Sequence, residues 1–264
     1  MLEVTILGCG GSAGVPQIGG PDGHGDWGAC DPAEPRNRRS RTSIVLHAPG
    51  GVTVLVDTGP DLRTQLLACG IPRVDALVYT HAHADHVVGL DEVRILNRIA
   101  NRPIEAFATD ATMKELVQRF DYAFKPGTPA FFYRPVVVPR LIEPGQDIAP
   151  AGVPIRTFDQ DHGVMRTLGL RCGGFGYSTD VVGLDDAAFA ALAGVDTWLV
   201  GCFQRRAHRT HAHLDVVINW ASRVGARRTV LTHMGPDLDW SWLVKRLPAG
   251  IEPGFDGQRL MISD

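Results

Sequence analysis

The 264-residue sequence has only five cysteines, and no two of them are spaced as Cys-x-x-Cys. A scattered, odd set of cysteines argues against a disulfide framework and against a zinc site built from thiolates, and it favours a reducing compartment. No apolar run approaches the roughly 20 residues that a membrane-spanning helix needs. The sequence opens on the strand-like segment LEVTIL, without the features of a signal peptide. We therefore expect a cytoplasmic protein.

A strong net charge is also absent. The formal charge is −3, so the protein has no global basic field that would attract long nucleic acids. One stretch, EPRNRRSRT at 34–42, is strongly basic. A solvated surface is the ordinary explanation of such a run. Because arginine suits bidentate binding of phosphate, Arg39 and Arg41 are nevertheless candidate substrate-binding residues.

Local patterns predict both strands and helices. The apolar run VDALVYT at 74–80 is typical of a buried strand. Residues 61–70 have helical periodicity, with Asp61 at the expected start and Gly70 at the expected end. A second helical stretch is expected at about 89–100.

The order of these elements predicts an architecture. Strand runs followed by helix–strand alternation occur in both halves of the sequence, and no linker separates the halves. Two mixed sheets packed face to face with helices outside would give this order. We expect an α/β protein with one domain over 1–264, folded as a four-layer αββα sandwich.

The segment THAHADHVVGL at 80–90 directly follows the predicted strand and crowds four metal-binding side chains into six positions. Side chains two apart in an extended segment point the same way, so His81 and His83 can hold one ion together. Asp85 and His86 come where the chain turns toward a helix, which directs them to a second ion. Neutral imidazole and carboxylate suit zinc, manganese or iron.

This HxHxDH row resembles the hallmark of the metallo-β-lactamase superfamily. Three further segments, each just past a predicted strand, extend the resemblance: DQDHG with His162, YSTD with Asp180 and VLTHM with His233. The resemblance implies that His81, His83 and His162 hold one ion. It implies that Asp85, His86 and His233 hold another and that Asp180 bridges both.

The segment VLVDTGP at 54–60 is also a feature of the superfamily. The resemblance implies that Asp57 lies behind the ligands and orients their loop. A simple turn aspartate before Gly59 and Pro60 is an equally good explanation of this residue.

Three longer segments narrow the resemblance to the PhnP-type phosphodiesterases, relatives of the tRNA 3′-processing endonucleases: LGCGGSAGVPQIG, the middle region around GYSTD, and THAHLDVVINWASRVGARRTVLTHMGPDLDW. The resemblance implies hydrolysis of small or cyclic phosphodiesters, such as cyclic ribosyl phosphates or 2′,3′-cyclic nucleotides, by a metal-bridging hydroxide. In this branch the general acid is a histidine 22 positions before the last ligand, which is His211 here, with His213 as the alternative. Asp85 adds the charge that holds the second ion.

The expected cofactors are two divalent ions, zinc or manganese, with iron as a further option. Many PhnP-like proteins also bind a structural zinc through a cysteine cluster near position 30 and a histidine three beyond the last ligand. This sequence has only Cys30 and carries Pro236 at the latter position. We therefore expect no structural zinc.

Other functions use the same metal row. A thioester hydrolase like glyoxalase II needs an added C-terminal helical domain, whereas only about thirty residues follow His233. A tRNA-processing nuclease normally carries a long basic arm. A non-catalytic binder like the PQQ-synthesis B proteins often has an eroded metal row. We expect a small phosphodiester or nucleotide substrate rather than a nucleic acid, no membrane partner, and a homodimer as one arrangement, since the family often dimerises.

Overall fold

The structure is a computed structural model that describes residues 1–125 and 136–263. Over these residues the strands form two seven-stranded sheets that face each other. The first sheet has the order β14 (Arg259–Ile262), β1 (Leu2–Gly8), β2 (Ser43–Ala48), β3 (Val52–Val56), β4 (Ala76–Val78), β5 (Ile104–Ala108) and β6 (Val137–Leu141). The second has the order β13 (Ile251–Pro253), β12 (Arg228–Thr232), β11 (Thr197–Gly201), β10 (Phe175–Ser178), β9 (Arg166–Cys172), β8 (Ile155–Asp161) and β7 (Asp147–Ile148).

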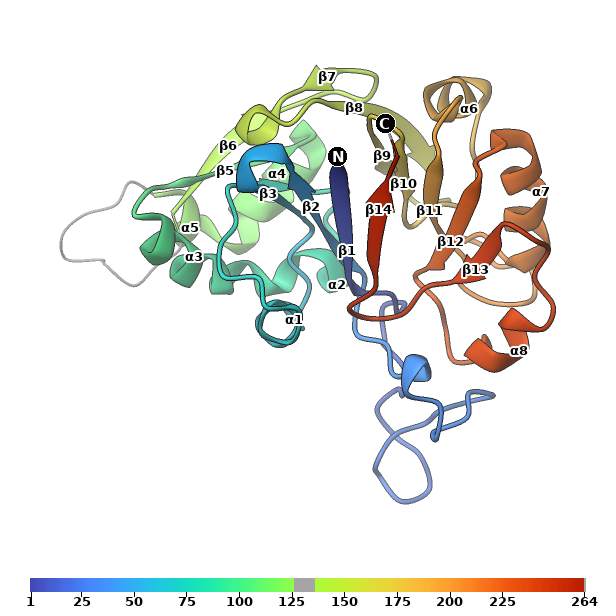
Figure 1. Ribbon diagram of the computed structural model, residues 1–264. Coiled ribbons are helices and arrows are strands. Elements are labelled where there is room, and N and C mark those ends of the chain that lie inside the picture. Colours follow the sequence, from blue (N-terminus) through green and yellow to red (C-terminus); the bar gives the residue numbers. More distant parts are fainter. Residues whose placement is uncertain (126–135, 264) are drawn as a thin grey trace.

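Helices cover the outer face of each sheet, as Figure 1 shows. Those of the first half are α1 (Leu62–Cys69), α2 (Ala84–Val87), α3 (Val93–Ala100), α4 (Asp110–Arg119) and α5 (Asp121–Phe124). Those of the second half are α6 (Asp186–Leu192), α7 (Leu214–Val224) and α8 (Trp240–Val244). The predicted four-layer αββα sandwich is confirmed. Within residues 1–125 and 136–263, no helix has the length and apolarity to cross a membrane.

Both sheets are mixed. Strands β3 to β6 run parallel in the first sheet, and β10 to β13 run parallel in the second. The remaining pairs are antiparallel, including β1 with β14, which places the two ends of the chain side by side. Ligand sites in such sheets form beyond the carboxyl ends of the parallel strands.

Strand β4 shows why the run at 74–80 is apolar on both faces. Ala76 and Val78 enter the core between the two sheets, whereas Leu77 enters the core between the first sheet and its helices. All three are fully buried. A strand with a core on each side has no solvent-facing positions, so alternation of polar and apolar residues disappears.

The helix predicted at 61–70 is confirmed as α1, which ends at Gly70 in the left-handed conformation (φ 65°). The helical stretch expected at about 89–100 is confirmed, and it consists of α3 preceded by a 3-10 segment, Val88–Glu92. There the amide of Gly89 donates to the Thr58 carbonyl at 2.8 Å. A Cβ at Gly89 would lie 2.0 Å from the Gly59 carbonyl oxygen, so this close approach of two loops requires glycine.

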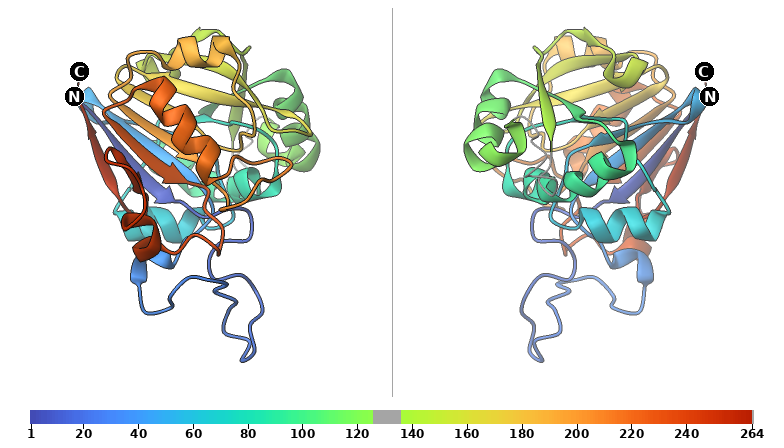
Figure 2. Two further views of the ribbon diagram at one scale, coloured as in Figure 1. Left: turned by 90° about the vertical axis from the view of Figure 1, so that its right-hand side faces the viewer. Right: turned by 90° about the vertical axis from the view of Figure 1, so that its left-hand side faces the viewer.

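The segment between β1 and β2 projects from the body of the molecule (Figures 1 and 2). Two hydrogen bonds hold the start of this segment. The Gly10 amide donates to the Ser40 carbonyl near the end of the same segment, and the Gly11 amide donates to the Met234 carbonyl in the second half of the sandwich. The basic run at 34–42 forms the end of this segment.

The inter-sheet core should carry most of the stability. We expect Leu170→Ala, at a position that is 2% exposed, to lower the free energy of unfolding by about 2–5 kcal/mol. Leu67→Ala is the matched control, since Leu67 is 67% exposed and its loss should change little. Denaturant unfolding measures both, and equal effects would contradict this assignment of the core.

Candidate metal centre and active site

The residues predicted as metal ligands follow strand ends in both sheets. His81 lies shortly after β4 in the first sheet, whereas His162, Asp180 and His233 follow β8, β10 and β12 in the second. The carboxyl ends of the parallel strands open at one edge of the sandwich, which brings segments about 150 positions apart in the sequence together.

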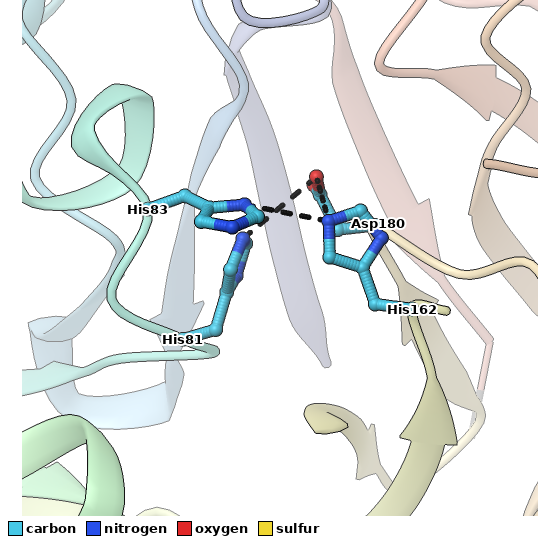
Figure 3. Close-up of side chains that lie close together, drawn as sticks. All are labelled: His81, His83, His162 and Asp180. Carbon is cyan, nitrogen blue, oxygen red and sulfur yellow. Dashed lines mark hydrogen bonds and ion pairs between the residues drawn. The ribbon is translucent and has the colours of Figure 1, made fainter. Parts of the chain in front are cut away.

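The first group of side chains consists of His81, His83, His162 and Asp180. One ligand atom from each lies within 4.8 Å of the others. Figure 3 shows the three imidazoles and the carboxylate directed toward a common point. His162 Nε2 is 3.6 Å from Asp180 Oδ1 and 3.3 Å from His83 Nδ1, and His81 Nε2 is 3.8 Å from Asp180 Oδ1.

The second group consists of Asp85, His86, Asp180 and His233, with ligand atoms within the same 4.8 Å. His86 Nε2 lies 3.1 Å from Asp180 Oδ2 and 3.3 Å from Asp85 Oδ2. His233 Nδ1 lies 3.2 Å from Asp180 Oδ2. Asp180 therefore directs Oδ1 to the first group and Oδ2 to the second, which is the geometry a bridging carboxylate needs.

Buried ring nitrogens without partners indicate that the cluster is built for cations. Within the described residues, His81 Nε2, His86 Nε2 and both ring nitrogens of His233 are buried and lack a hydrogen-bond partner. A buried polar atom left unpaired costs about 1–3 kcal/mol, so these atoms need another ligand. A divalent metal ion would satisfy them, and three imidazoles with carboxylates form a donor set that zinc and manganese accept.

The charge states of His81, His83, His233 and Asp180 agree with metal binding. Burial lowers the pKa of His81, His83 and His233, so their imidazoles are neutral, which is the form that binds metal. Burial opposes ionisation of Asp180, but its electrostatic interactions and hydrogen bonding with the surrounding histidines outweigh burial and hold the pKa of this carboxyl well below its ordinary value. At His86 burial lowers the pKa, but Asp180 and a second carboxylate together raise it well above the ordinary value.

That second carboxylate is Asp57, which is fully buried at the end of β3. Its Oδ2 accepts hydrogen bonds from His86 Nδ1 and Thr80 Oγ1, each at 2.7 Å, and its Oδ1 accepts from the Thr80 amide at 2.8 Å. Thr80 Oγ1 is in turn 3.0 Å from His81 Nδ1. Asp57 thus holds Nδ1 of His86 directly and Nδ1 of His81 through Thr80. In the loop that carries these ligands, residues 80–86, Nε2 of both histidines is left to face the cluster.

His211 lies at the rim of the cluster. Its Nδ1 is 3.8 Å from Asp180 Oδ1, and its side chain is 14% exposed. Its ring centroid lies 4.9 Å from that of His233 and 4.7 Å from that of His162. Burial, and then the electrostatic interaction with the neighbouring His233, lower the pKa of His211 to about 3 in the metal-free chain.

The alternative acid, His213, occupies the N-cap position of α7 and makes no capping hydrogen bond with its side chain. In the part of the chain that the structure describes, no ring contact or ion pair joins it to the cluster. The structure therefore brings His211, and not His213, beside Asp180.

Phe203 is a site residue that the sequence analysis missed. Its ring lies 4.8 Å from that of His211 and 6.2 Å from that of His233, and its amide donates to the Ala212 carbonyl at 2.9 Å. The only signal in the sequence was its place just after a buried strand, which it shares with many core residues. Packing against Phe203 restricts the orientation of His211.

The expectation that Arg39 binds substrate is not supported by its placement. Arg39 is 2% exposed, and its Nη2 donates to the Leu238 carbonyl at 2.7 Å and to Asn37 Oδ1 at 3.2 Å. Its Nη1 donates to the Gly235 carbonyl at 3.3 Å. These bonds tie the basic run to the segment that follows His233, so the guanidinium positions this segment. Arg41, in contrast, is 29% exposed.

The expected absence of a structural zinc stays a prediction. Cys30 is buried, and its Sγ lies 4.0 Å from Arg39 Nη1. Asn37, which the sequence analysis did not single out, is fully buried, and its Nδ2 donates to Asp239 Oδ2 at 2.7 Å. Polar side chains therefore hold together the region around Cys30.

The fold and the cluster are those of a metal-dependent hydrolase with a metallo-β-lactamase sandwich. The family described as the beta-lactamase superfamily domain matches residues 52–234, and the chain belongs to this family. Among solved structures, a diphosphatase from the PhnP family has a TM-score of 0.89 and 33% sequence identity, with coverage of 100% of this chain and 98% of that one. The PhnP-type branch predicted from the sequence is thereby confirmed.

Curated relatives include ribonuclease Z of Mycolicibacterium gilvum, which is 27% identical over 299 residues and covers 99% of this chain and 96% of its own length. An octanoyltransferase of Porphyromonas gingivalis is 27% identical over 272 residues. That alignment covers all of this chain but 52% of the relative, so the chain spans about half the length of that protein.

If the cluster binds divalent ions, metal should stabilise the fold. At a concentration one hundred times its Kd, a bound ion contributes about 2.7 kcal/mol, which corresponds to a rise in Tm of roughly 5–10 °C at this chain length. We expect zinc or manganese to produce this rise in chelator-treated protein and Asp180→Asn to abolish most of it. Asp186→Asn, on the exposed part of α6, is the control. A full metal-induced shift in the Asp180 variant would contradict the shared ligand.

The role of Arg39 gives a separate prediction. Arg39→Met leaves the Gly235 and Leu238 carbonyls without their buried donor, so it should lower the free energy of unfolding by about 1–3 kcal/mol. The substitution should also weaken metal binding, because the segment that Arg39 holds, which includes Gly235 and Leu238, directly follows the ligand His233. Arg38→Met is the control, since Arg38 is exposed. Calorimetric metal titration would contradict this role if Arg39→Met and wild type bound metal equally.

Proposed function

We propose that this protein is a metal-dependent phosphodiesterase that hydrolyses small or cyclic phosphodiesters. The observation that supports this most directly is the position of Asp180. It is shared by two groups of buried ligands and has His211 Nδ1 at 3.8 Å on its open side. A phosphodiester bound there would have cations on one side and a proton donor on the other.

Two divalent ions, with His81, His83 and His162 around one and Asp85, His86 and His233 around the other, would supply Lewis acidity and lower the pKa of water. The carboxylates of Asp180 and Asp85 provide the negative charge that holds two cations in a buried cluster.

His211 acts as the general acid in this proposal. Its ring nitrogen Nδ1 faces the cluster, where the leaving oxygen gains negative charge as its bond to phosphorus breaks. An anionic phosphodiester beside the ring favours its protonated form, because opposite charges attract. Transfer of that proton to the leaving oxygen neutralises the charge. Packing against Phe203 keeps the ring in place for this transfer.

A small substrate suits this chain better than an RNA. Within the projecting segment, the part at 12–34 contains Asp22, Asp26, Asp31 and Glu34 and has no lysine or arginine, since the arginines of the segment lie in the basic run at its end. Proteins that bind RNA backbones neutralise phosphates with many cationic side chains. The acidic part at 12–34 would repel a polynucleotide, which argues against the tRNA-processing alternative.

Hydrolysis of a diphosphate bond is a second candidate, because the PhnP-family relative with 33% identity is a diphosphatase. The chemistry would be the same at this site. Water would add to one phosphorus, the bond to the bridging oxygen would break, and His211 would protonate the departing phosphate.

The remaining alternatives predict different results. A thioester hydrolase would cleave S-lactoylglutathione and leave phosphodiesters intact. A non-catalytic binder would take up no metal under metal-replete conditions, whereas the proposed hydrolase should hold about two equivalents per chain.

The general acid can be tested by substitution. With manganese or zinc, the protein should hydrolyse bis(4-nitrophenyl) phosphate or a 2′,3′-cyclic nucleotide. His211→Ala should lower kcat by about 10²–10⁴ while the metal content stays unchanged, because the leaving oxygen loses its proton donor. His213→Ala is the matched control and should retain activity. Full activity in the His211 variant, with loss in the His213 variant, would move the role to His213.

A further inference from the structure

The carbonyl of Ala82, inside the ligand loop at 80–86, is bound by a side chain from outside the metal cluster. Arg119 Nη1 donates to this carbonyl at 2.7 Å. Arg119 is the last residue of α4 and lies 37 positions further along the chain. Ala82 is 3% exposed, so its carbonyl needs a partner within the protein. Because the guanidinium is charged, this bond is stronger than one from a neutral donor.

Helix α4 brings Arg119 to the loop. Thr112 and Leu116 are buried, and Arg119 follows Leu116 by three positions, so it continues the buried side of the helix. Its Nη2 donates to Glu115 Oε2, one turn earlier, at 2.8 Å. A cation in the last turn of a helix is also favoured by the helix dipole. The guanidinium is therefore held on its own helix at Nη2 and presents Nη1 to the loop.

On this side the ligand loop borders a cavity. Thr80 and Ala82 line a space of about 510 Å³, and Glu115 lines the same space. Close packing, which fixes most buried backbone, is therefore incomplete here. The hydrogen bond from Arg119 supplies a fixed contact at a point where the loop has few packed neighbours.

His83 is the ligand of this loop that depends most on its backbone. Its Nδ1 lies 3.3 Å from His162 Nε2 (Figure 3), and among the described residues no hydrogen bond holds its Nε2. Its side chain is only partly buried. Three other ligand histidines have a partner behind the ring: Thr80 Oγ1 for His81 at 3.0 Å, Asp57 Oδ2 for His86 at 2.7 Å and the Thr210 carbonyl for His162 at 2.7 Å. The direction of the His83 ring therefore depends on where the backbone places it.

We propose that Arg119 is a positioning residue for the first group of metal ligands and that it acts through His83. The Ala82 carbonyl belongs to the planar peptide group that ends at the His83 nitrogen, so a bond that fixes this carbonyl fixes that plane. On the other side, the His83 carbonyl accepts from the His86 amide at 3.0 Å. With both flanking peptide groups held, His83 Nδ1 stays directed toward the other ligands of its group. This rests on the metal binding in the proposed function, and not on the hydrolysis.

Metal affinity tests this assignment. We expect Arg119→Met to weaken one of the two metal-binding steps about 10–100-fold, the usual effect of losing a partner behind a ligand, and to leave the other step nearly unchanged. Calorimetric titration of chelator-treated protein with zinc measures both steps, and the d–d absorption of bound cobalt reports the geometry of the weakened site. A purely structural role would lower Tm without changing either affinity or the cobalt spectrum, and that result would overturn the proposal.

Two further variants separate the bond to the loop from a general loss of charge. Arg119→Lys should restore part of the affinity, because an ammonium group can still donate to the Ala82 carbonyl. Arg94→Met is the matched control: Arg94 is 40% exposed, against 41% for Arg119, and it pairs with Asp91 at 3.4 Å. Within residues 1–125 and 136–263, no hydrogen bond joins Arg94 to the ligand loop. An equal loss of affinity in Arg94→Met would contradict the proposal.

A double-mutant cycle tests whether the effect passes through His83. In a His83→Gln background, Arg119→Met should have little further effect on metal affinity, because both changes remove the same contribution. In an Asp85→Asn background, which alters a ligand of the second group, Arg119→Met should keep its full effect. Additive losses in the His83 background would refute the role of His83.

The same measurements separate this proposal from the proposed hydrolysis. If the wild type binds metal but leaves phosphodiesters intact, and Arg119→Met lowers the affinity, the hydrolysis proposal fails and the assignment of Arg119 stands. If phosphodiesters are hydrolysed and Arg119→Met binds metal as the wild type does, the assignment of Arg119 fails alone. A wild type that binds no metal would overturn both.

Discussion

The hydrogen bonds of the buried Asp57 carboxylate are the interaction on which the site depends. This one group accepts from His86 Nδ1, from the Thr80 hydroxyl and from the Thr80 amide, and through Thr80 it reaches His81. Without it, the rings of the ligand loop could turn, and their Nε2 atoms would not be held toward Asp180. Asp57 and this loop both follow strands of the first sheet, so the carboxylate joins the ends of two neighbouring strands, β3 and β4.

The backbone at the cluster is held in conformations that non-glycine residues rarely adopt. Asp57, Asp180 and His233 have φ values of 65°, 47° and 53°. Left-handed backbone in such residues costs energy and persists where the surrounding structure fixes it. Each of the three comes within two residues after the carboxyl end of a strand, Asp57 after β3, Asp180 after β10 and His233 after β12. Ligands from two sheets can therefore meet at one point.

The basic run shows how different environments give similar side chains different roles. Arg39 enters a buried network with Asn37 and positions the segment after His233, whereas Arg41, two residues later, is partly exposed and pairs with Asp61. In the sequence both looked like candidates for phosphate binding. Neighbours from distant segments decide between them: the Gly235 and Leu238 carbonyls capture Arg39, and Asp61 anchors Arg41 at one edge. Asp61 also begins α1 where the periodicity predicted, but its carboxylate binds the Arg41 amide rather than capping the helix.

The sequence by itself determined the layers of the sandwich and the family, because both depend on short-range patterns. Apolar runs mark strands buried on both faces, glycines mark turns, and the HxHxDH row with three later ligands follows strand ends in a recognisable order. Only the tertiary structure decided that His211 rather than His213 lies beside Asp180, that Phe203 packs on it, and that Arg39 is buried. These outcomes depend on contacts between residues far apart in the chain, such as Arg39 with Leu238, and local spacing carries no information about which distant carbonyl or ring a side chain will meet.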